Sequence, residues 1–272
     1  MELNVRGFEA KAYAYTGGKA FDPALPCIVF VHGALHDHSV WTLLARWFAH
    51  HGHAVLAIDQ PGHGRSGGAP LASVETTADW LLALLAAAGV GKAAFVGHSM
   101  GSLIALEAAA RAPATACALV MIGTAYPMKV AEALLETART APLKAIDMVN
   151  VFSHSGIAAK PSYPGPGTWL HGANRALMRR VQAGQTAVNL FHHDFGVCDR
   201  YAGGLEAAAK VACPVSLVLG DRDQMTQPRQ SADIARALKA KVHTVGAGHA
   251  LMTEAPDAVL SALREALHTP GR

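Results

Sequence analysis

One pentapeptide in this sequence has the residue types and the spacing of a strained nucleophile turn. Gly97-His98-Ser99-Met100-Gly101 fits the pattern G-x-S-x-G and lies between an apolar run, Ala93–Gly97, and a helical pattern. Glycine at the flanking positions allows close approach of neighbouring chain, so that the serine hydroxyl is accessible. The start of the helix supplies free N–H groups where an oxyanion would form. The pattern therefore indicates that Ser99 is a nucleophile.

A serine hydroxyl is a weak nucleophile until a base takes its proton, so a histidine must lie near Ser99 in space. Among the 15 histidines, His249 is the best candidate because it follows a predicted strand in the glycine-rich loop Gly246-Ala247-Gly248. An acid must orient that histidine. Asp221 and Asp223 both follow the apolar run Val215–Leu219, and position alone leaves the two open.

The elements that must position these residues alternate between strand and helix. Continuous apolar and β-branched runs predict buried strands, and helical periodicity follows several of them. Such an alternation predicts a doubly wound, mostly parallel α/β sheet, with Leu3 to Tyr15 as an antiparallel edge pair. The predicted strands are Cys27–Val31, Ala54–Ile58, Ala93–Gly97, Ala118–Ile122, Val215–Leu219 and Val242–Val245.

One long stretch interrupts this alternation. From about Tyr126 to Ala208 there is no buried strand pattern, but there are amphipathic helical pieces at Val130–Ala138 and Arg175–Val181. A helical insertion between two core strands is expected to cover the carboxyl edge of the sheet, where open α/β sheets bind ligands. We therefore predict a core formed by residues 1–125 and 209–272 and a helical cap formed by residues 126–208.

Several motifs in order make the chain resemble the α/β-hydrolase family over nearly its full length. Beside the G-x-S-x-G pentapeptide, these are Phe30-Val31-His32-Gly33-Ala34, Asp59-Gln60-Pro61-Gly62-His63-Gly64-Arg65-Ser66, Gly220-Asp221-Arg222-Asp223 and Gly248-His249. The order serine, aspartate, histidine is also that of the family. The resemblance implies a capped α/β-hydrolase fold and favours Asp223 over Asp221 as the acid. It further implies an oxyanion hole formed by the backbone N–H groups of Ala34 and Met100.

The composition excludes several other classes of protein. Half of the 272 residues (51%) are hydrophobic, 16% are charged and the net charge is +3, with the basic residues scattered. No polybasic run predicts a nucleic-acid or membrane partner, and no apolar stretch reaches the ~18 residues that span a bilayer. No signal peptide is recognisable, and the four cysteines are not closely paired. We therefore predict a cytoplasmic protein, monomeric or homodimeric, whose partner is a small molecule.

Two histidine clusters raise the question of a metal. They are His36-Asp37-His38 and His192-His193-Asp194, and neither has the spacing of a helical His-x-x-x-His site or a cysteine partner. We therefore predict no metal and no cofactor. The expected walls of the substrate pocket are Leu35, His36, Trp41, Trp169, Phe191 and Phe195.

These features together predict a serine hydrolase that cleaves a small carboxylic ester through an acyl-enzyme. The same groups also serve lactonases and C–C bond hydrolases, which stay open as alternatives. Cap arginines such as Arg175 and Arg179 are candidates to bind an acidic substrate of that kind. A non-catalytic ligand-binding protein with this fold is the alternative of another class.

Overall fold

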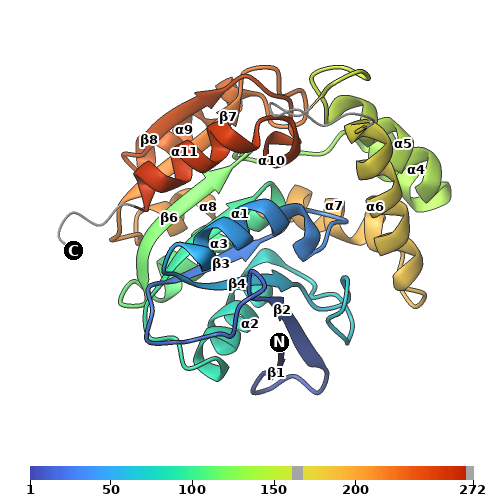
Figure 1. Ribbon diagram of the computed structural model, residues 1–272. Coiled ribbons are helices and arrows are strands. Elements are labelled where there is room, and N and C mark those ends of the chain that lie inside the picture. The colour runs from blue at the N-terminus through green and yellow to red at the C-terminus, as the bar shows by residue number, and fades with distance from the viewer. Residues whose placement is uncertain (161–167, 268–272) are drawn as a thin grey trace.

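An eight-stranded, mostly parallel sheet with helices on both faces forms the centre of the protein (Figure 1). The computed structural model describes residues 1–160 and 168–267. The strand order is β1-β2-β4-β3-β5-β6-β7-β8, and only the β1–β2 and β2–β4 pairs are antiparallel. This confirms the predicted fold class and the antiparallel edge pair. The strands are β1 (Glu2–Asn4), β2 (Lys11–Tyr15), β3 (Cys27–Val31), β4 (Ala54–Asp59), β5 (Ala93–His98), β6 (Ala116–Ile122), β7 (Val215–Gly220) and β8 (Lys241–Val245).

The central strands are buried along their length because helices cover both faces of the sheet. Every residue of β3, β4 and β5 is buried, which explains why their sequences are continuous apolar runs without alternation. One face is covered by α1 (Thr42–His50) and α11 (Pro256–Ala266). The other is covered by α2 (Val74–Ala87), α3 (Met100–Arg111), α8 (Gly204–Ala208) and α9 (Ala232–Ala237). Two 3₁₀ helices, His38–Trp41 and Pro228–Ser231, and the short helix α10 (Leu251–Glu254) complete this part of the chain.

The helix α2 illustrates how local sequence sets an element boundary. Ser73 has an extended backbone, and its hydroxyl accepts a hydrogen bond from the backbone N–H of Thr76, while the Thr76 hydroxyl accepts one from the Ser73 N–H. This capping box satisfies two N–H groups that have no partner inside the helix. Gly89 follows the other end with φ +74°, a conformation that favours glycine. The helix therefore begins and ends where its cap and the following glycine place it.

In the described part of the chain five helices lie between β6 and β7, and four of them stand together beside the carboxyl edge of the sheet (Figure 1). The predicted helical pieces fall within or close to α4 and α6. The Pro- and Gly-rich residues 161–167 lie outside the described residues. Further along, α8 packs against α3 and α9. The four helices are α4 (Glu132–Thr140), α5 (Pro142–Phe152), α6 (Leu170–Gly184) and α7 (Leu190–Arg200).

The helices of the described part of the chain are short. None of them combines the length and the apolar character needed to cross a membrane.

Candidate active site

Ser99 occupies the sharp turn between β5 and α3 and has a strained backbone. Its φ is +53° and its ψ is −122°, outside the regions that residues with a side chain normally adopt. A Cβ on Gly97 would lie 2.1 Å from the carbonyl oxygen of Gly101, and a Cβ on Gly101 would lie 2.3 Å from that of Val31. Both positions therefore require glycine, as the pentapeptide predicted. The turn presents Ser99 at the carboxyl end of a central strand.

His249 and Asp223 are hydrogen-bonded to one another, although 26 positions separate them. Nδ1 of His249 lies 2.8 Å from Oδ2 of Asp223, and both residues are buried. Since a carboxylate only accepts, Nδ1 carries the proton of this hydrogen bond. Burial opposes the charge of Asp223, but the contacts with His249 and Thr226 lower the pKa of its carboxyl group below the ordinary value. The carboxylate of Asp223 therefore fixes the orientation of the His249 ring, with Nδ1 as the donor.

Asp221 is placed differently from Asp223. It is exposed, and its carboxylate contacts only the neighbouring Arg222 among the interactions found, at 3.4 Å. Asp223 instead points inward from the same turn, since its Oδ1 accepts hydrogen bonds from the backbone N–H groups of Met225 and Thr226, both at 2.8 Å. Of the two aspartates, only Asp223 contacts His249.

Two further residues hold this histidine, and sequence reasoning missed the roles of both. The hydroxyl of Thr226 donates to Oδ2 of Asp223 at 2.8 Å and lies 3.2 Å from Nδ1 of His249. Nε2 of His98 donates to the backbone carbonyl of His249 at 2.9 Å, and His98 is buried. No short-range motif predicts the contact that either residue makes with His249, because the partners are distant in the sequence.

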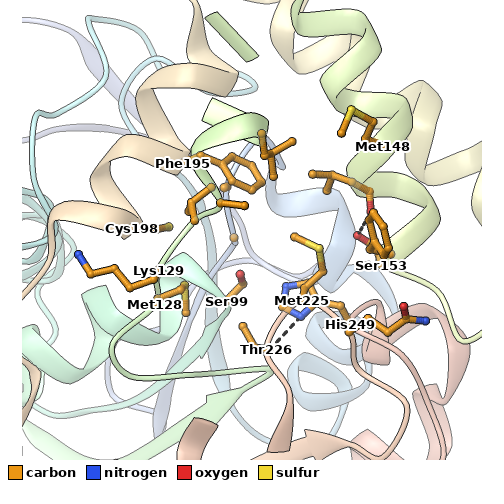
Figure 2. Close-up of a pocket in the computed structure, with 18 of the residues that line it drawn as sticks. Ser99, Met128, Lys129, Met148, Ser153, Phe195, Cys198, Met225, Thr226 and His249 are labelled. Carbon is orange, nitrogen blue, oxygen red and sulfur yellow. Dashed lines mark hydrogen bonds between the residues drawn. The ribbon is translucent and has the colours of Figure 1, made fainter. Parts of the chain in front are cut away.

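Ser99 and His249 line one cavity of about 380 Å³, between the sheet edge and the helices α4 to α7 (Figure 2). Figure 2 shows that Ser99, Met225 and His249 lie at its base and that Phe195 and Met148 face them from the helices. Ala34 lies on the wall, and Met100 is the first residue of α3, whose first-turn N–H groups have no partner inside the helix. The remaining wall is mostly apolar and includes Met128, Val130, Leu134, Val149, Phe152, Met178 and Cys198.

Of the six predicted pocket walls, only His36 and Phe195 line this cavity. Trp41 packs in the core against Phe30, on the sheet face covered by α1. Leu35 is completely buried, and Trp169 is 53% exposed, with its indole N–H donating to the carbonyl of Ile157. Phe191 is buried behind Phe195, on which its ring stacks. The expectation for these four residues was wrong, because apolar character alone does not distinguish a pocket wall from the core.

The predicted cap arginines do not face the cavity either. Arg175 and Arg179 both donate to the carboxylate of Asp147, at 2.6 and 3.1 Å. Lys129 is among the lining residues found, but Figure 2 shows its ammonium group directed away from Ser99. That group donates to the backbone carbonyl of Asp199 and lies 3.8 Å from the carboxylate of the same residue.

The histidine clusters have protein partners. Asp37, His38 and Asp59 form a group of potential ligand atoms, but Oδ1 of Asp59 accepts from the backbone N–H of His38 and Oδ2 accepts from that of Arg65. Nδ1 of His38 also lies 2.8 Å from Asp59. Because these oxygens already have N–H donors, the group gives no argument for a metal site.

Cys198 is the one thiol among the lining residues found. Burial and the nearby carboxylate of Asp194 raise its pKa far above the ordinary value. The sulfur is therefore a neutral, weakly nucleophilic thiol.

Comparisons with known proteins agree with the fold described above. A family profile described as "Alpha/beta hydrolase family" matches residues 28–262. A "Putative non-heme haloperoxidase" of Mycobacterium phage D29 is 35% identical over 99 residues, which cover 36% of each chain, so the match spans about a third of that relative. The solved structure of the enol-lactonase from Burkholderia xenovorans LB400 superimposes with a TM-score of 0.80, at 21% identity over 98% of this chain and 99% of that one. An esterase from Exiguobacterium antarcticum gives 0.81, at 13% identity over 97% and 98%. At these identities the two structures show a shared fold.

Proposed function

Because the chain belongs to the alpha/beta hydrolase family, we propose that it is a serine hydrolase that cleaves a small carboxylic ester through an acyl-enzyme. One observation carries the proposal. Ser99 and His249 line the same apolar cavity (Figure 2). Ser99 lies on a strained turn, and Nδ1 of His249 is hydrogen-bonded to Asp223.

In the proposed reaction, Nε2 of His249 takes the hydroxyl proton of Ser99 while Oγ attacks the ester carbonyl carbon. The carbonyl oxygen becomes an oxyanion, for which we assign the N–H groups of Ala34 and Met100 as donors. The bond to the alcohol oxygen then breaks, and His249 returns the proton to that oxygen. Water attacks the acyl-enzyme in the same way, its proton passes through His249 to Oγ, and the carboxylic acid leaves.

The size and chemistry of the cavity support a small, uncharged acyl group. A volume of about 380 Å³ lies near the lower end of the range of ligand sites, roughly 300–1,000 Å³. Each buried methylene is worth about 0.8 kcal/mol, so the rate constant kcat/KM should rise with acyl length until the cavity is full. Beyond that length the packed walls resist expansion and the rate should fall. Four methionines, Met128, Met148, Met178 and Met225, supply adaptable apolar surface.

A lactone is the second candidate substrate. Ring opening of a lactone uses the same nucleophile, base and donors, and the likeness to an enol-lactonase extends over nearly the whole chain. A binding protein that merely retains the three residues would acylate at most once and would not turn over.

The test is a series of 4-nitrophenyl esters of two to twelve acyl carbons, run beside a lactone. We expect kcat/KM to peak between about two and eight carbons, since each methylene discriminates by ~1–3 kcal/mol in a fitted pocket. A fluorophosphonate should label the wild-type protein but not Ser99→Ala. Ser153→Ala is the matched control, because Ser153 lines the same cavity but its hydroxyl donates to the carbonyl of Val149. Labelling that survives in Ser99→Ala, or turnover of no substrate, would refute the proposal.

A further inference from the structure

The peptide group between Ala34 and Leu35 is held at both of its ends. Its N–H, from Leu35, donates to Oδ2 of Asp194 at 2.8 Å. Its carbonyl oxygen, from Ala34, accepts a hydrogen bond from Nδ1 of His36 at 2.7 Å. Leu35 has a φ of +55° and no exposed surface, so this peptide is strained as well as buried. A strained peptide keeps such an orientation only where its surroundings fix it.

The group that fixes the N–H end comes from the inserted helices. Asp194 lies on α7, 159 positions from Leu35 in the sequence, and it is 1% exposed. Its Oδ2 also accepts from Nε2 of His63 at 2.9 Å, and its Oδ1 lies 3.1 Å from Nδ1 of His193. A buried carboxylate is costly unless donors surround it, and here three donors do. Asp194 is therefore fixed in position, with one lone pair assigned to Leu35.

The charge on Asp194 is balanced inside the same cluster. Both ring nitrogens of His63 face oxygen acceptors, since Nδ1 lies 3.0 Å from the carbonyl of Pro61 and Nε2 faces Asp194. Two acceptors require two ring protons, so His63 is an imidazolium ion and the pair is a buried ion pair. Asp194 thus stays ionised and available as an acceptor for the Leu35 N–H.

We propose that Asp194 is a positioning residue for the oxyanion hole, an inference that rests on the proposed function. Fixing the peptide that follows Ala34 restricts rotation about Ala34, whose own N–H is one of the two assigned donors. The inserted helix α7 thereby orients a donor of the sheet edge, and the hole is complete only when α7 is seated. The helices over the cavity then contribute to the rate of the chemical step as well as to the binding of substrate.

Replacing Asp194 tests this directly. Asp194→Ala withdraws the acceptor, and we expect kcat to fall ~10²-fold with KM within about threefold, because loss or displacement of one oxyanion donor acts on the transition state. Asp194→Asn should recover most of that loss, since an amide oxygen in the Oδ2 position still accepts from Leu35. The affinity of a trifluoromethyl ketone, whose adduct carries an oxyanion, should fall in proportion to kcat/KM. The affinity of the product alcohol should be unchanged.

The matched control breaks another contact between the inserted helices and the sheet edge. Arg180 on α6 donates to Asp37 at 2.7 Å, and Arg180→Gln should leave kcat and ketone affinity within about twofold of wild type.

If Asp194→Ala does not fold, Asp194→Ser carries the same test, because its shorter side chain also withdraws the acceptor from Leu35. A loss expressed in KM alone, or unchanged ketone affinity, would overturn the inference. Activity in Ser99→Ala would instead refute the proposed function, whereas an inactive Ser99→Ala beside a fully active Asp194→Ala refutes only the role of Asp194.

Discussion

At the scale of single residues, the acid turn shows how one carboxylate is selected from two. Oδ1 of Asp223 accepts two backbone N–H groups, and its Oδ2 accepts from Thr226 and from His249. Asp221, two positions earlier, lies in solvent. The backbone hydrogen bonds of the turn therefore determine which side chain faces inward, and a difference in activity between the two positions follows.

Asp223→Asn should lower kcat about 10⁴-fold, because an amide that donates to His249 favours the wrong ring tautomer. Asp221→Asn is the matched control and should change kcat less than about threefold, since its carboxylate touches neither His249 nor the cavity. Steady-state kinetics on the best 4-nitrophenyl ester decide the matter. Equal losses in the two variants would contradict the proposed role of Asp223.

The glycines of the nucleophile turn give a second prediction at this scale. Gly101→Ala places a methyl group 2.3 Å from the carbonyl oxygen of Val31. That oxygen belongs to the backbone of a central strand, so it cannot move aside as a flexible side chain could. We expect a loss of ~1–3 kcal/mol or more in the free energy of unfolding, measured by urea denaturation. Gly91→Ala is the control, because its Cβ would meet nothing within 4 Å, and it should be neutral or stabilising by about 0.4–1 kcal/mol. Equal stability of the two variants would contradict the packing argument.

At the scale of elements, the buried pair of His63 and Asp194 joins the turn after β4 to α7. Although burial opposes a charged ring, Asp194 raises the pKa of His63 above the ordinary 6.5. Burial likewise opposes a charged Asp194, yet His63 lowers the pKa of that carboxyl group below the ordinary 3.8. Burial and the neighbouring His63 lower the pKa of His32 to about 4, so this ring stays neutral at pH 5 to 7. We therefore expect the attachment of α7 to the sheet edge to depend on pH.

His63→Gln should remove that pH dependence. Because the pKa of His63 is raised on folding, the pair stabilises the folded state fully below about pH 6.5, and this contribution is lost as the pH rises through the pKa of the folded state. Because the pKa of Asp194 is lowered on folding, its contribution is lost on the acid side, as the pH falls below about 4. The difference in unfolding free energy between wild type and His63→Gln should therefore be largest near pH 5 to 6 and decline above pH 6.5. Urea denaturation across this range measures it. His50→Gln, at an exposed position, should give a flat difference, and a flat profile for His63→Gln as well would contradict the argument.

At the scale of the whole molecule, the sheet separates two apolar layers. Because both layers pack on the same strands, we expect them to unfold together. Phe48 on α1 lies in the layer of one face, and Leu81 on α2 lies in the layer of the other. Both are almost completely buried, whereas Leu43 on α1 is 53% exposed. Each layer thus packs against the same central strands, which are buried on both sides.

Leu81→Ala and Phe48→Ala should each lower the free energy of unfolding by about 2–5 kcal/mol, through lost burial and the cavity left behind. Each should shift one common transition, seen identically by circular dichroism and tryptophan fluorescence. Leu43→Ala is the control and should stay within about 0.5 kcal/mol. Two separate transitions in either core variant would show that the faces unfold independently.

The sequence by itself determined the elements of this fold, because their signals are local. Continuous apolar runs predict strands β3 to β7, and their ends lie within two residues of those observed. The mixed run Val242–Val245 predicts β8, which is a mostly exposed edge strand and not a buried one. Ser73 and Gly89 have the residue types that begin and end α2. The spacing Gly97-x-Ser99-x-Gly101 predicts the strained turn, since both glycines stand where backbone atoms approach most closely. In each case the physical constraint acts within a few residues of the chain.

Only the tertiary structure decided which side chains surround the cavity and which hold its polar groups. Trp41 and Phe191 are as apolar as Phe195, yet the first two are buried in the core and only Phe195 reaches the cavity wall. Thr226 bonds to Asp223 and His249 across a turn, and Asp194 bonds to Leu35 across 159 positions. Hydrophobicity and hydrogen-bonding capacity are properties of a residue, but the neighbours that its side chain contacts depend on packing between distant elements. That packing is set by the sheet order and by the seating of the inserted helices, which no local pattern encodes.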